Sequence, residues 1–298
     1  MFTKLMKIRS TIYSLIQRQS EIYEAVGHIK EALGRVEARQ NRAETGEGLA
    51  VQEFKVYSQW GEDGIIQHLL RHVEIKNPVF VEFGVENYKQ ANTRFLLINN
   101  NWSGLVIDGS PDNVSSIKTD PIYWGYNLKA ECAFITKDNI NELLKRSGIA
   151  GDIGLLSVDI DGNDYWVWNE IEIISPRIVI IEYNSRFGAE RAITVPYDAA
   201  FVRRNVHYSS IYFGASLRAL VGLGKKKGYS FVGCNKNGVN AFFVRKDVLG
   251  ELKELTVEEG YVAVKLREAH NKEGKLAYMN FDEEVNLLKG LPFVEVAD

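Results

Sequence analysis

Four short apolar segments of this chain each run directly into an acidic residue. They are Val79–Val81 before Glu82, Leu105–Ile107 before Asp108, Leu155–Val158 before Asp159, and Ile178–Ile181 before Glu182. Segments of this length that are rich in valine and isoleucine are typical of strands buried on both faces of a parallel sheet. Parallel strands end at a common edge, and open α/β sheets bind their ligands outside that edge. The pattern therefore predicts an α/β fold whose ligand lies beside a row of carboxylates.

Helical segments are expected to alternate with these strands. The strands are expected at 79–83, 104–108, 154–159 and 178–183, and the helices near 89–99, 111–118, 137–147, 163–173 and 214–227. Two later strands, at 229–234 and 239–245, flank the turn-forming residues Asn235–Gly238. This order predicts a doubly wound, Rossmann-like sheet that carries a terminal antiparallel hairpin.

The first forty residues carry a different pattern, an apolar stripe with alternating spacings of three and four residues. Its positions are Leu5, Ile8, Ile12, Leu15, Gln19, Ile22, Val26, Ile29, Leu33 and Val36, of which only Gln19 is polar. This is a heptad seam, so residues 1–40 are interpreted as a coiled-coil helix that joins copies of the chain through residues 5–36. Leucine or isoleucine at the first core position with isoleucine at the second favours a trimer or a larger assembly. The alternative is a single helix docked on the globular domain.

Residues 41–50 are polar, contain two glycines and are interpreted as a linker to a domain spanning 51–298. Residues 1–20 contain four basic residues and no acid, which suits either contact with an anionic membrane surface or a solvated helix face. The net charge of −3 argues against nucleic-acid binding. No run of about 18 apolar residues is present. Two widely separated cysteines fit a cytoplasmic protein, peripheral to the inner membrane if the basic tip touches it.

The first two strand ends indicate the cofactor. The turn Glu82–Glu86 contains one glycine, Gly84, whereas a dinucleotide-binding turn uses three glycines to bring its backbone close to a pyrophosphate. S-adenosylmethionine lacks phosphates and needs less room. A carboxylate at the end of the second strand can accept hydrogen bonds from ribose hydroxyls. The predicted cofactor-binding residues are Glu82, Gly84, Glu86, Asp108, Gly109 and Asp159; the alternative is that Glu82 and Asp108 are strand-end charges facing water.

The other two strand ends indicate the chemistry. The loop 159–164 contains three acids and an asparagine, and the neighbouring strand continues into Glu182–Asn184. Neither calcium-loop nor zinc-ligand spacing is present, but oxygen donors from adjacent strand ends can hold Mg²⁺ or another divalent cation. The predicted metal ligands are Asp161, Glu182 and Asn184, and the predicted catalytic residues are Asp159, Asp161 and His207, the last as a general base. The alternatives are that Asp161 or Asp164 caps the following helix, and that His207 only packs.

Several motifs together resemble a known enzyme family. They are Ser58–Gly64, Phe80–Gly84, Ile107–Gly109, Ser157–Asp164 and Asn240–Val244. Over residues 55–245 the chain resembles the FkbM-type branch of class I S-adenosylmethionine-dependent methyltransferases. The resemblance implies a seven-stranded sheet, a cofactor near Glu82, Gly84 and Asp108, and methyl transfer to an oxygen, often on a sugar or glycosylated product. It also implies metal ligands at Asp159 or Asp161, Glu182 and Asn184, although Tyr183 between the last two departs from the family pattern.

The sequence thus predicts an oligomeric O-methyltransferase whose carboxylates, or a bound divalent ion, activate a hydroxyl of a sugar, a polysaccharide or a glycosylated product. Aligning two bound reactants would supply much of the acceleration. The enzyme alternative is a nicotinamide-dependent oxidoreductase, which the missing glycines oppose. The non-enzyme alternative is a catalytically inactive, methyltransferase-like scaffold or partner in surface polysaccharide assembly.

Overall fold

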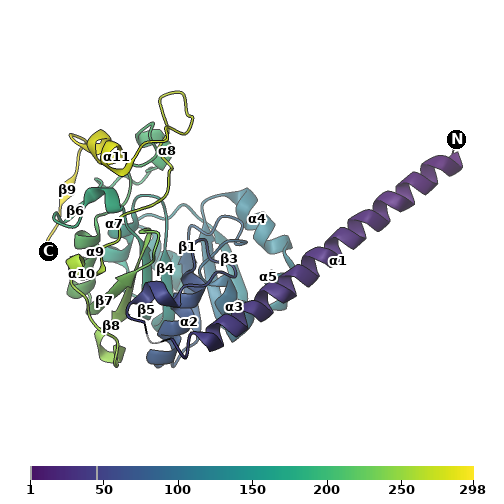
Figure 1. The fold of residues 1–298 in the computed structure, drawn as a ribbon, viewed down its shortest axis with the longest axis horizontal. Coiled ribbons are helices and arrows are strands. Elements are labelled where there is room, and N and C mark those ends of the chain that lie inside the picture. The colour runs from purple at the N-terminus through teal and green to yellow at the C-terminus, as the bar shows by residue number, and fades with distance from the viewer. Residues whose placement is uncertain (1, 45) are drawn as a thin grey trace.

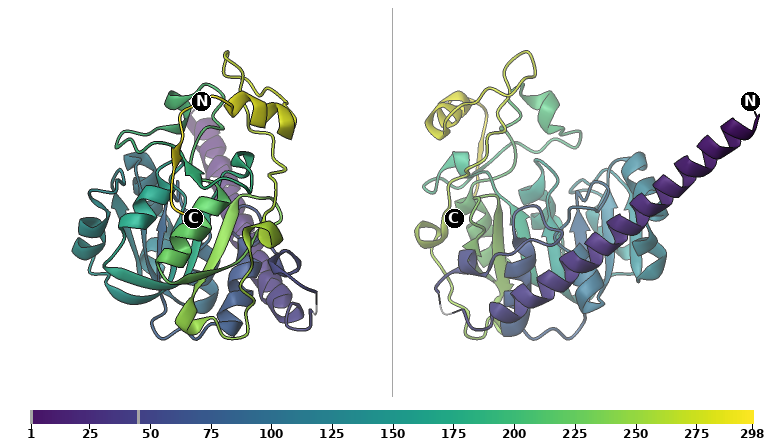
Figure 2. Two further views of the ribbon diagram at one scale, coloured as in Figure 1. Left: turned by 90° about the vertical axis from the view of Figure 1, so that its left-hand side faces the viewer. Right: turned by 45° about the vertical axis from the view of Figure 1, so that its right-hand side comes forward.

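The computed structural model describes residues 2–44 and 46–298, but not the side chains of residues 2–5 and 8. The predicted roles of the Leu5 and Ile8 side chains in the seam, and of Thr45 in the linker, therefore lie outside the described part. A long helix, α1 (Phe2–Gln40), projects from an α/β body (Figures 1 and 2). In the described residues, no helix is long and apolar enough to cross a membrane.

Seven strands form one mixed sheet in the order β3–β2–β1–β4–β5–β8–β7. The strands are β1 (Val79–Phe83), β2 (Ser103–Asp108), β3 (Leu128–Cys132), β4 (Gly151–Val158), β5 (Ile174–Glu182), β7 (Tyr229–Cys234) and β8 (Asn240–Arg245). The first five are parallel, and β8 pairs antiparallel with both β5 and β7. The predicted doubly wound sheet with its terminal hairpin is therefore confirmed. Strand order reverses between β1 and β4, the position at which such sheets bind ligands.

The strand β3 and the start of one helix differ from the sequence-based expectation. No strand was expected at β3, because this edge strand exposes Lys129 and has no continuous apolar run. The helix expected near 89–99 begins only at Arg94, because Glu82 draws the backbone of Asn92 and Thr93 into a turn. Tertiary contacts, which local patterns do not record, decide both cases.

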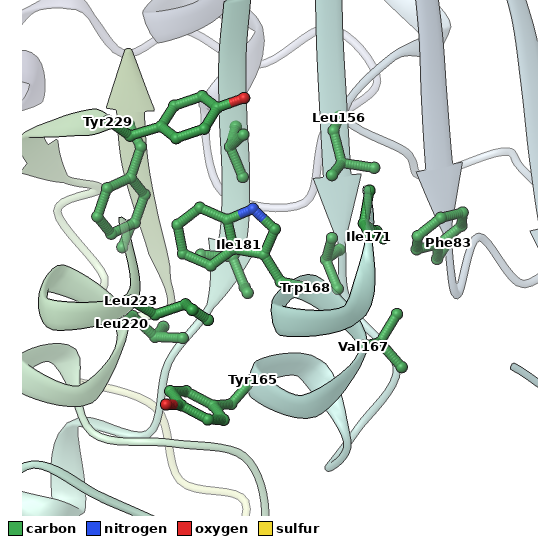
Figure 3. Packing of buried hydrophobic residues seen from close by; sticks show 14 of the residues in the cluster. Phe83, Leu156, Tyr165, Val167, Trp168, Ile171, Ile181, Leu220, Leu223 and Tyr229 are labelled. Atoms are coloured by element: carbon green, nitrogen blue, oxygen red, sulfur yellow. The ribbon is translucent and has the colours of Figure 1, made fainter. Parts of the chain in front are cut away.

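Helices cover both faces of the sheet. The helices are α2 (Glu62–His72), α3 (Arg94–Asn100), α4 (Pro111–Thr119), α5 (Pro121–Gly125), α6 (Ile140–Arg146), α7 (Asp164–Glu170), α8 (Arg203–Val206), α9 (Leu217–Lys226), α10 (Val257–Gly260) and α11 (Phe281–Leu288), with short 3-10 turns at η1 (Leu49–Gln52), η2 (Ser185–Phe187) and η3 (Lys246–Val248). One core lies between the sheet and α6, α7 and α9, and the other between the sheet and α2 to α5. In the first core, Trp168 of α7 reaches toward the sheet (Figure 3). The centroid of its ring lies 5.1 Å from that of Phe243.

The C-terminal part of the chain returns to the carboxyl edge of the sheet. β6 (Ile193–Thr194) pairs with β9 (Val294–Glu295), and a third apolar cluster joins this pair to α11 and to residues 201–213. Figure 1 shows α8, α11 and the connecting loop together on one side of the sheet. These segments form a wall above the strand ends, which positions residues far apart in sequence around one pocket.

The segment interpreted as coiled coil and linker is partly packed on the body. Leu49 of η1 is buried in the second core, and Gly34 of α1 is buried against Val56 and Phe95. Parts of the expected coiled-coil helix and of the expected linker therefore contact the body, and the domain bounds 1–40, 41–50 and 51–298 stay a prediction.

Candidate functional site

A pocket of about 680 Å³ lies at the carboxyl ends of β1, β2, β4 and β5 and at the start of β8. Its lining includes Glu82, Gly84–Glu86, Asp108, Gly109, Asp159–Asp161 and Glu182, so the four acid-tipped strands meet at one cavity. Its other side is lined by Phe201–Arg204 and by Leu266, Glu268 and His270. The predicted common edge is thus a single concave site.

Glu82 holds the turn after β1. Its Oε1 accepts a hydrogen bond from the backbone N of Asn92 (2.8 Å), and its Oε2 accepts from the backbone N (3.0 Å) and the hydroxyl (2.5 Å) of Thr93. Burial raises the pKa of the Glu82 carboxyl to about 7, although the hydrogen bonds from Thr93 and Asn92 act in the opposite direction. Glu82 lines the pocket, but its strongest contacts are with its own loop, so it shapes the cofactor end more than it offers a free carboxylate.

Gly84 is required by a close backbone approach. Its φ of +70° lies in the left-handed region, and a Cβ placed there would come within 1.6 Å of the Asp159 carbonyl oxygen. The glycine therefore lets the end of β1 pass directly beside the end of β4. This explains why one glycine is needed here whether or not a cofactor is bound.

Asp108 ends β2 and is buried at the pocket wall. Its Oδ2 accepts a hydrogen bond from the backbone N of Glu86 (2.8 Å), while its Oδ1 accepts from the backbone N of Ser110 (2.8 Å) and from Asn113 Nδ2 (2.9 Å). A carboxylate offers about four acceptor positions, so one position on Oδ2 is left for a ligand. Glu86 itself is exposed and contributes its backbone to this arrangement. Gly109 follows at the open rim.

Phe134 is a residue of this end that sequence reasoning missed. Its side chain is 49% exposed although it is aromatic, and it lines the pocket close to Gly109. An aromatic face left open to a pocket suits stacking against a planar ring. The only sequence signal is an aromatic residue just after a strand, and that strand, β3, was not predicted.

Three carboxyl groups gather at the other end. Asp159, Asp161 and Glu182 each offer an oxygen, and these oxygens lie within 4.8 Å of one another. Burial, then the charges of Asp161 and Asp164, raises the pKa of Asp159 well above its usual value. Burial, then the charge of Asp159, does the same for the pKa of Glu182. The Glu182 Oε2 atom is buried without a hydrogen-bond partner among the described residues, so this cluster has capacity for a proton, a cation or a hydrogen-bond donor.

Asp164 does not cap α7, because Asn163 occupies the N-cap position and no side chain forms a cap hydrogen bond there; Asp164 instead holds the loop that precedes the helix. Its carboxylate accepts hydrogen bonds from the backbone N of Ile160 (2.8 Å) and of Gly162 (2.9 Å), and it is buried at the start of α7. Asp161 is instead exposed, with φ of +58°, so the loop turns its carboxylate toward the pocket mouth.

Arg203 is the counter-charge of the cluster and was not anticipated. Its guanidinium forms ion pairs with Asp161 (2.9 Å) and Glu268 (2.6 Å) and lies 3.7 Å from the Phe213 ring centroid. Burial alone would lower the pKa of Arg203, but the charges of Glu182, Glu268 and Asp161 raise it above its ordinary value. No local motif marks this arginine, because its partners come from β4, β5 and the C-terminal segment.

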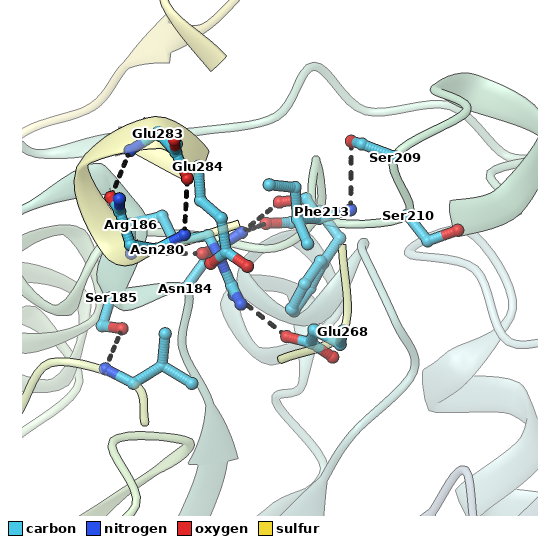
Figure 4. Close-up of polar contacts among 12 residues, drawn as sticks. Asn184, Ser185, Arg186, Ser209, Ser210, Phe213, Glu268, Asn280, Glu283 and Glu284 are labelled. Carbon is cyan, nitrogen blue, oxygen red and sulfur yellow. Dashed lines mark hydrogen bonds and ion pairs between the residues drawn. The ribbon is translucent and has the colours of Figure 1, made fainter. Parts of the chain in front are cut away.

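Two of the predicted site residues lie outside this arrangement. Asn184 donates through Nδ2 to the carbonyl oxygens of Ile211 (2.9 Å) and Phe213 (3.0 Å), and its Oδ1 accepts from the Arg186 backbone N (Figure 4). Its amide is therefore committed to loop structure, and we remove Asn184 from the candidate metal ligands. Figure 4 also shows the neighbouring Arg186 between Glu268 and Glu284, which ties α11 to the pocket wall.

His207 is the second such residue. It is not among the described residues that line the pocket; its Nδ1 lies 2.6 Å from Ser209 Oγ, and its ring packs on Tyr208. The packing alternative describes it better than the general-base role. The histidine that does line the pocket is His270, which arrives from the C-terminal segment and whose Nδ1 is buried without a partner among the described residues.

A buried carboxylate, Glu62, orients one further pocket residue through hydrogen bonds that we call the Glu62 clamp. Glu62 at the start of α2 is fully buried; its Oε1 accepts from Asn235 Nδ2 (2.8 Å) and Asn240 Nδ2 (2.9 Å), and its Oε2 accepts from the Trp60 backbone N (2.9 Å). Because a carboxylate only accepts hydrogen bonds, the Asn240 amide must present its NH₂ to Glu62 and keep Oδ1 for other partners. Asn240 pairs with Glu182 across β8 and β5 and lines the pocket. The motifs at 58–64 and 240–244 are thus joined in space.

Comparisons with known proteins give only a remote likeness. No protein-family model matches this chain, and no curated protein matches it. Among solved structures, a methyltransferase from Clostridium acetobutylicum described as S-adenosylmethionine-dependent is 11% identical, with a TM-score of 0.40 over 62% of this chain and 90% of its own. TrmK of M. capricolum, solved with S-adenosyl-homocysteine, is 13% identical, with a TM-score of 0.37 over 65% of this chain and 74% of its own. The CMeT domain of the citrinin polyketide synthase is 10% identical, with a TM-score of 0.39 over 62% and 51%. Overlaps this partial carry no functional conclusion, and the fold assignment rests on strand order.

Proposed function

We propose that this chain is a methyltransferase that binds S-adenosylmethionine over the carboxyl ends of β1 and β2. The observation that carries the proposal is Asp108, a buried carboxylate at the end of β2 that lines the pocket and keeps one acceptor position on Oδ2 for a ribose hydroxyl. The exposed ring of Phe134 supports it as a stacking surface for adenine. The single-glycine turn at Gly84 supports it because a dinucleotide needs a glycine-rich turn.

The acceptor we propose is a hydroxyl of a sugar, a polysaccharide or a glycosylated product. The far end of the pocket is rich in hydrogen-bond acceptors: the carboxyl groups of Asp159 and Glu182, and the carbonyl oxygen that the Glu62 clamp leaves on Asn240. Such a surface complements a ligand that donates several hydrogen bonds, as vicinal hydroxyls do. The resemblance to the FkbM-type branch supports the same class of acceptor.

Asp159 is the residue that we propose receives the hydroxyl proton, with Glu182 beside it. A divalent cation at the same place is a variant of this proposal, because three carboxyl oxygens within 4.8 Å are the hard donors that Mg²⁺ or Ca²⁺ prefers. Asp159 and Glu182 would be its main ligands, because Arg203 already pairs with Asp161. When bound, such an ion lowers the pKa of a coordinated hydroxyl.

The cofactor assignment is tested by thermal unfolding of the full chain with S-adenosylhomocysteine and, separately, with NAD⁺. A ligand at about 100 times its Kd stabilises the folded state by about 2.7 kcal/mol. For a body of this size that corresponds to a rise in Tm of roughly 5–10 °C. We expect this rise with S-adenosylhomocysteine and none with NAD⁺. A rise with NAD⁺ alone would favour the oxidoreductase, and no response to any methyl-donor analogue would favour the inactive scaffold.

A further inference from the structure

Helix α1 packs one face on the body; we call this face, together with the turn residue that follows the helix, the docking face, formed by Lys30, Glu31, Gly34, Ala38 and Asn41. A Cβ on Gly34 would lie 2.4 Å from Val56 Cγ2, so α1 contacts the body at that point as closely as only a glycine allows. The docking face is further held by polar contacts: Tyr57 donates its hydroxyl to Glu31 Oε1 (2.8 Å), Arg71 Nη1 donates to the Ala38 carbonyl (3.2 Å), and Lys30 Nζ lies 4.6 Å from the Tyr57 ring centroid.

The heptad seam lies on another side of the same helix. At 3.6 residues per turn the centre of its positions 22–36, the part beside the body, is roughly 130° away from that of the docking face. Its aliphatic side chains are exposed in the single chain: Ile12 51%, Leu15 58%, Ile22 63%, Val26 53%, Ile29 60%, Leu33 59% and Val36 39%. The body therefore does not cover the seam, even where α1 runs along the body. An apolar stripe of this length on a water-facing helix marks an interaction surface.

We infer that the occupant of this seam is the seam of a second copy of this chain, in parallel and in register, with each docking face still bound to its own body. A heptad spacing is complementary to another helix with the same spacing, since each core side chain inserts between four side chains of its partner. A second copy supplies that spacing at every layer. This inference does not depend on the proposed enzymatic function.

Gln19 indicates whether the paired α1 helices run parallel or antiparallel. If two copies ran antiparallel with the full seam matched, position 19 would face position 22, so that the Gln19 amide would meet the aliphatic Ile22. In a parallel, in-register pair Gln19 faces Gln19, and each amide finds both a donor and an acceptor. A buried amide without a partner is costly, which is how a single polar core position selects an arrangement. The like charges of Arg9 and Arg18 oppose parallel packing only weakly, because these side chains are exposed and screened beyond about 8 Å at physiological salt.

The arrangement has a geometric consequence. Parallel helices place all the α/β bodies at one end of the assembly and gather the basic residues of positions 1–20 at the other. An antiparallel arrangement would put bodies at both ends.

The first test is the mass of the full chain in solution, measured by sedimentation across a range of concentrations. We expect an assembly of two or more copies for the wild type. The double variant Ile12→Asp/Ile22→Asp should be monomeric. Tyr13→Asp is the matched control, because Tyr13 is equally exposed at 61% but lies outside the seam, and it should assemble as the wild type does. A monomeric wild type, a double variant that still assembles, or a control that also dissociates would each overturn the inference.

The second test is disulfide trapping in a Cys132→Ser background, which removes the exposed native thiol. Ile12→Cys alone should give covalent dimers on mild oxidation, because parallel seams place position 12 against itself. An equimolar mixture of Ile12→Cys and Ile29→Cys chains should give no disulfide that joins position 12 of one chain to position 29 of another. A product found only in the mixture would overturn the parallel arrangement.

Discussion

The Glu62 clamp gives a quantitative prediction about stability. Glu62 is fully buried and accepts three hydrogen bonds, from the side chains of Asn235 and Asn240 and from the backbone of Trp60. In Glu62→Ala all three donors lose their partner, and Asn235 is itself fully buried. A buried donor that loses a charged acceptor costs about 1.5–3 kcal/mol. Because Trp60 and Asn240 retain some access to water, we expect the free energy of unfolding to fall by about 3–5 kcal/mol.

The variant Glu62→Gln separates the contribution of the side chain's shape to stability from that of its charge. The glutamine keeps one carbonyl oxygen that can accept from both asparagines, but its NH₂ faces the Trp60 backbone N, which is also a donor. We therefore expect a smaller loss, about 1–2 kcal/mol. The assay is equilibrium urea unfolding at fixed protein concentration, followed by circular dichroism and tryptophan fluorescence. Glu254→Ala, at an exposed glutamate, is the control and should stay within about 0.5 kcal/mol of the wild type. A loss below about 1 kcal/mol for Glu62→Ala would refute the clamp.

Three further predictions follow from single contacts. Gly84→Ala should unfold or misplace the β1 turn, because its Cβ would overlap the Asp159 carbonyl; native-like stability by thermal melting would contradict this. Arg203→Ala should leave the acidic cluster without its counter-charge, so Mg²⁺ should stabilise the variant by more degrees of Tm than it stabilises the wild type, whereas an equal response would argue against the cation variant of the site. Gly34→Leu should separate α1 from Val56 and Phe95 and speed amide hydrogen exchange in residues 27–41, while Gly27→Leu, where a Cβ meets nothing within 4 Å, should not.

The sheet was largely predictable from sequence because its central strands are buried on both faces and therefore read as continuous apolar runs. β3 was missed because an edge strand with exposed Lys129 lacks that run. The acids at the strand ends were predicted for the same local reason. Their hydrogen-bond partners were not predicted, since the donors to Asp108 come from loop and helix residues that only the folded chain brings to it.

The acceptor end was the less predictable half of the site. Asn184 was predicted to be a metal ligand from its position after a strand, but its side-chain amide donates hydrogen bonds to the carbonyl oxygens of Ile211 and Phe213. Arg203 lies in no motif and is defined by ion pairs with distant acids. Asn240 begins one of the motifs, but its place in the site depends on a hydrogen bond to Glu62, 178 residues away. Sequence patterns place residues on elements, whereas the choice of partner depends on which loops cover the sheet edge.

Titration calorimetry with S-adenosylhomocysteine, comparing wild type, Asp108→Ala and Asn113→Ala, tests the central assignment most directly. Asn113→Ala removes a loop contact of Asp108 but leaves the carboxylate, so it controls for loop disturbance. We predict one site per chain in the wild type and a 10- to 100-fold weaker affinity in Asp108→Ala, equivalent to about 1.4–2.7 kcal/mol. The loss in Asn113→Ala should be clearly smaller. Absence of binding by the wild type, or an unchanged affinity in Asp108→Ala, would contradict the placement of the cofactor at the end of β2.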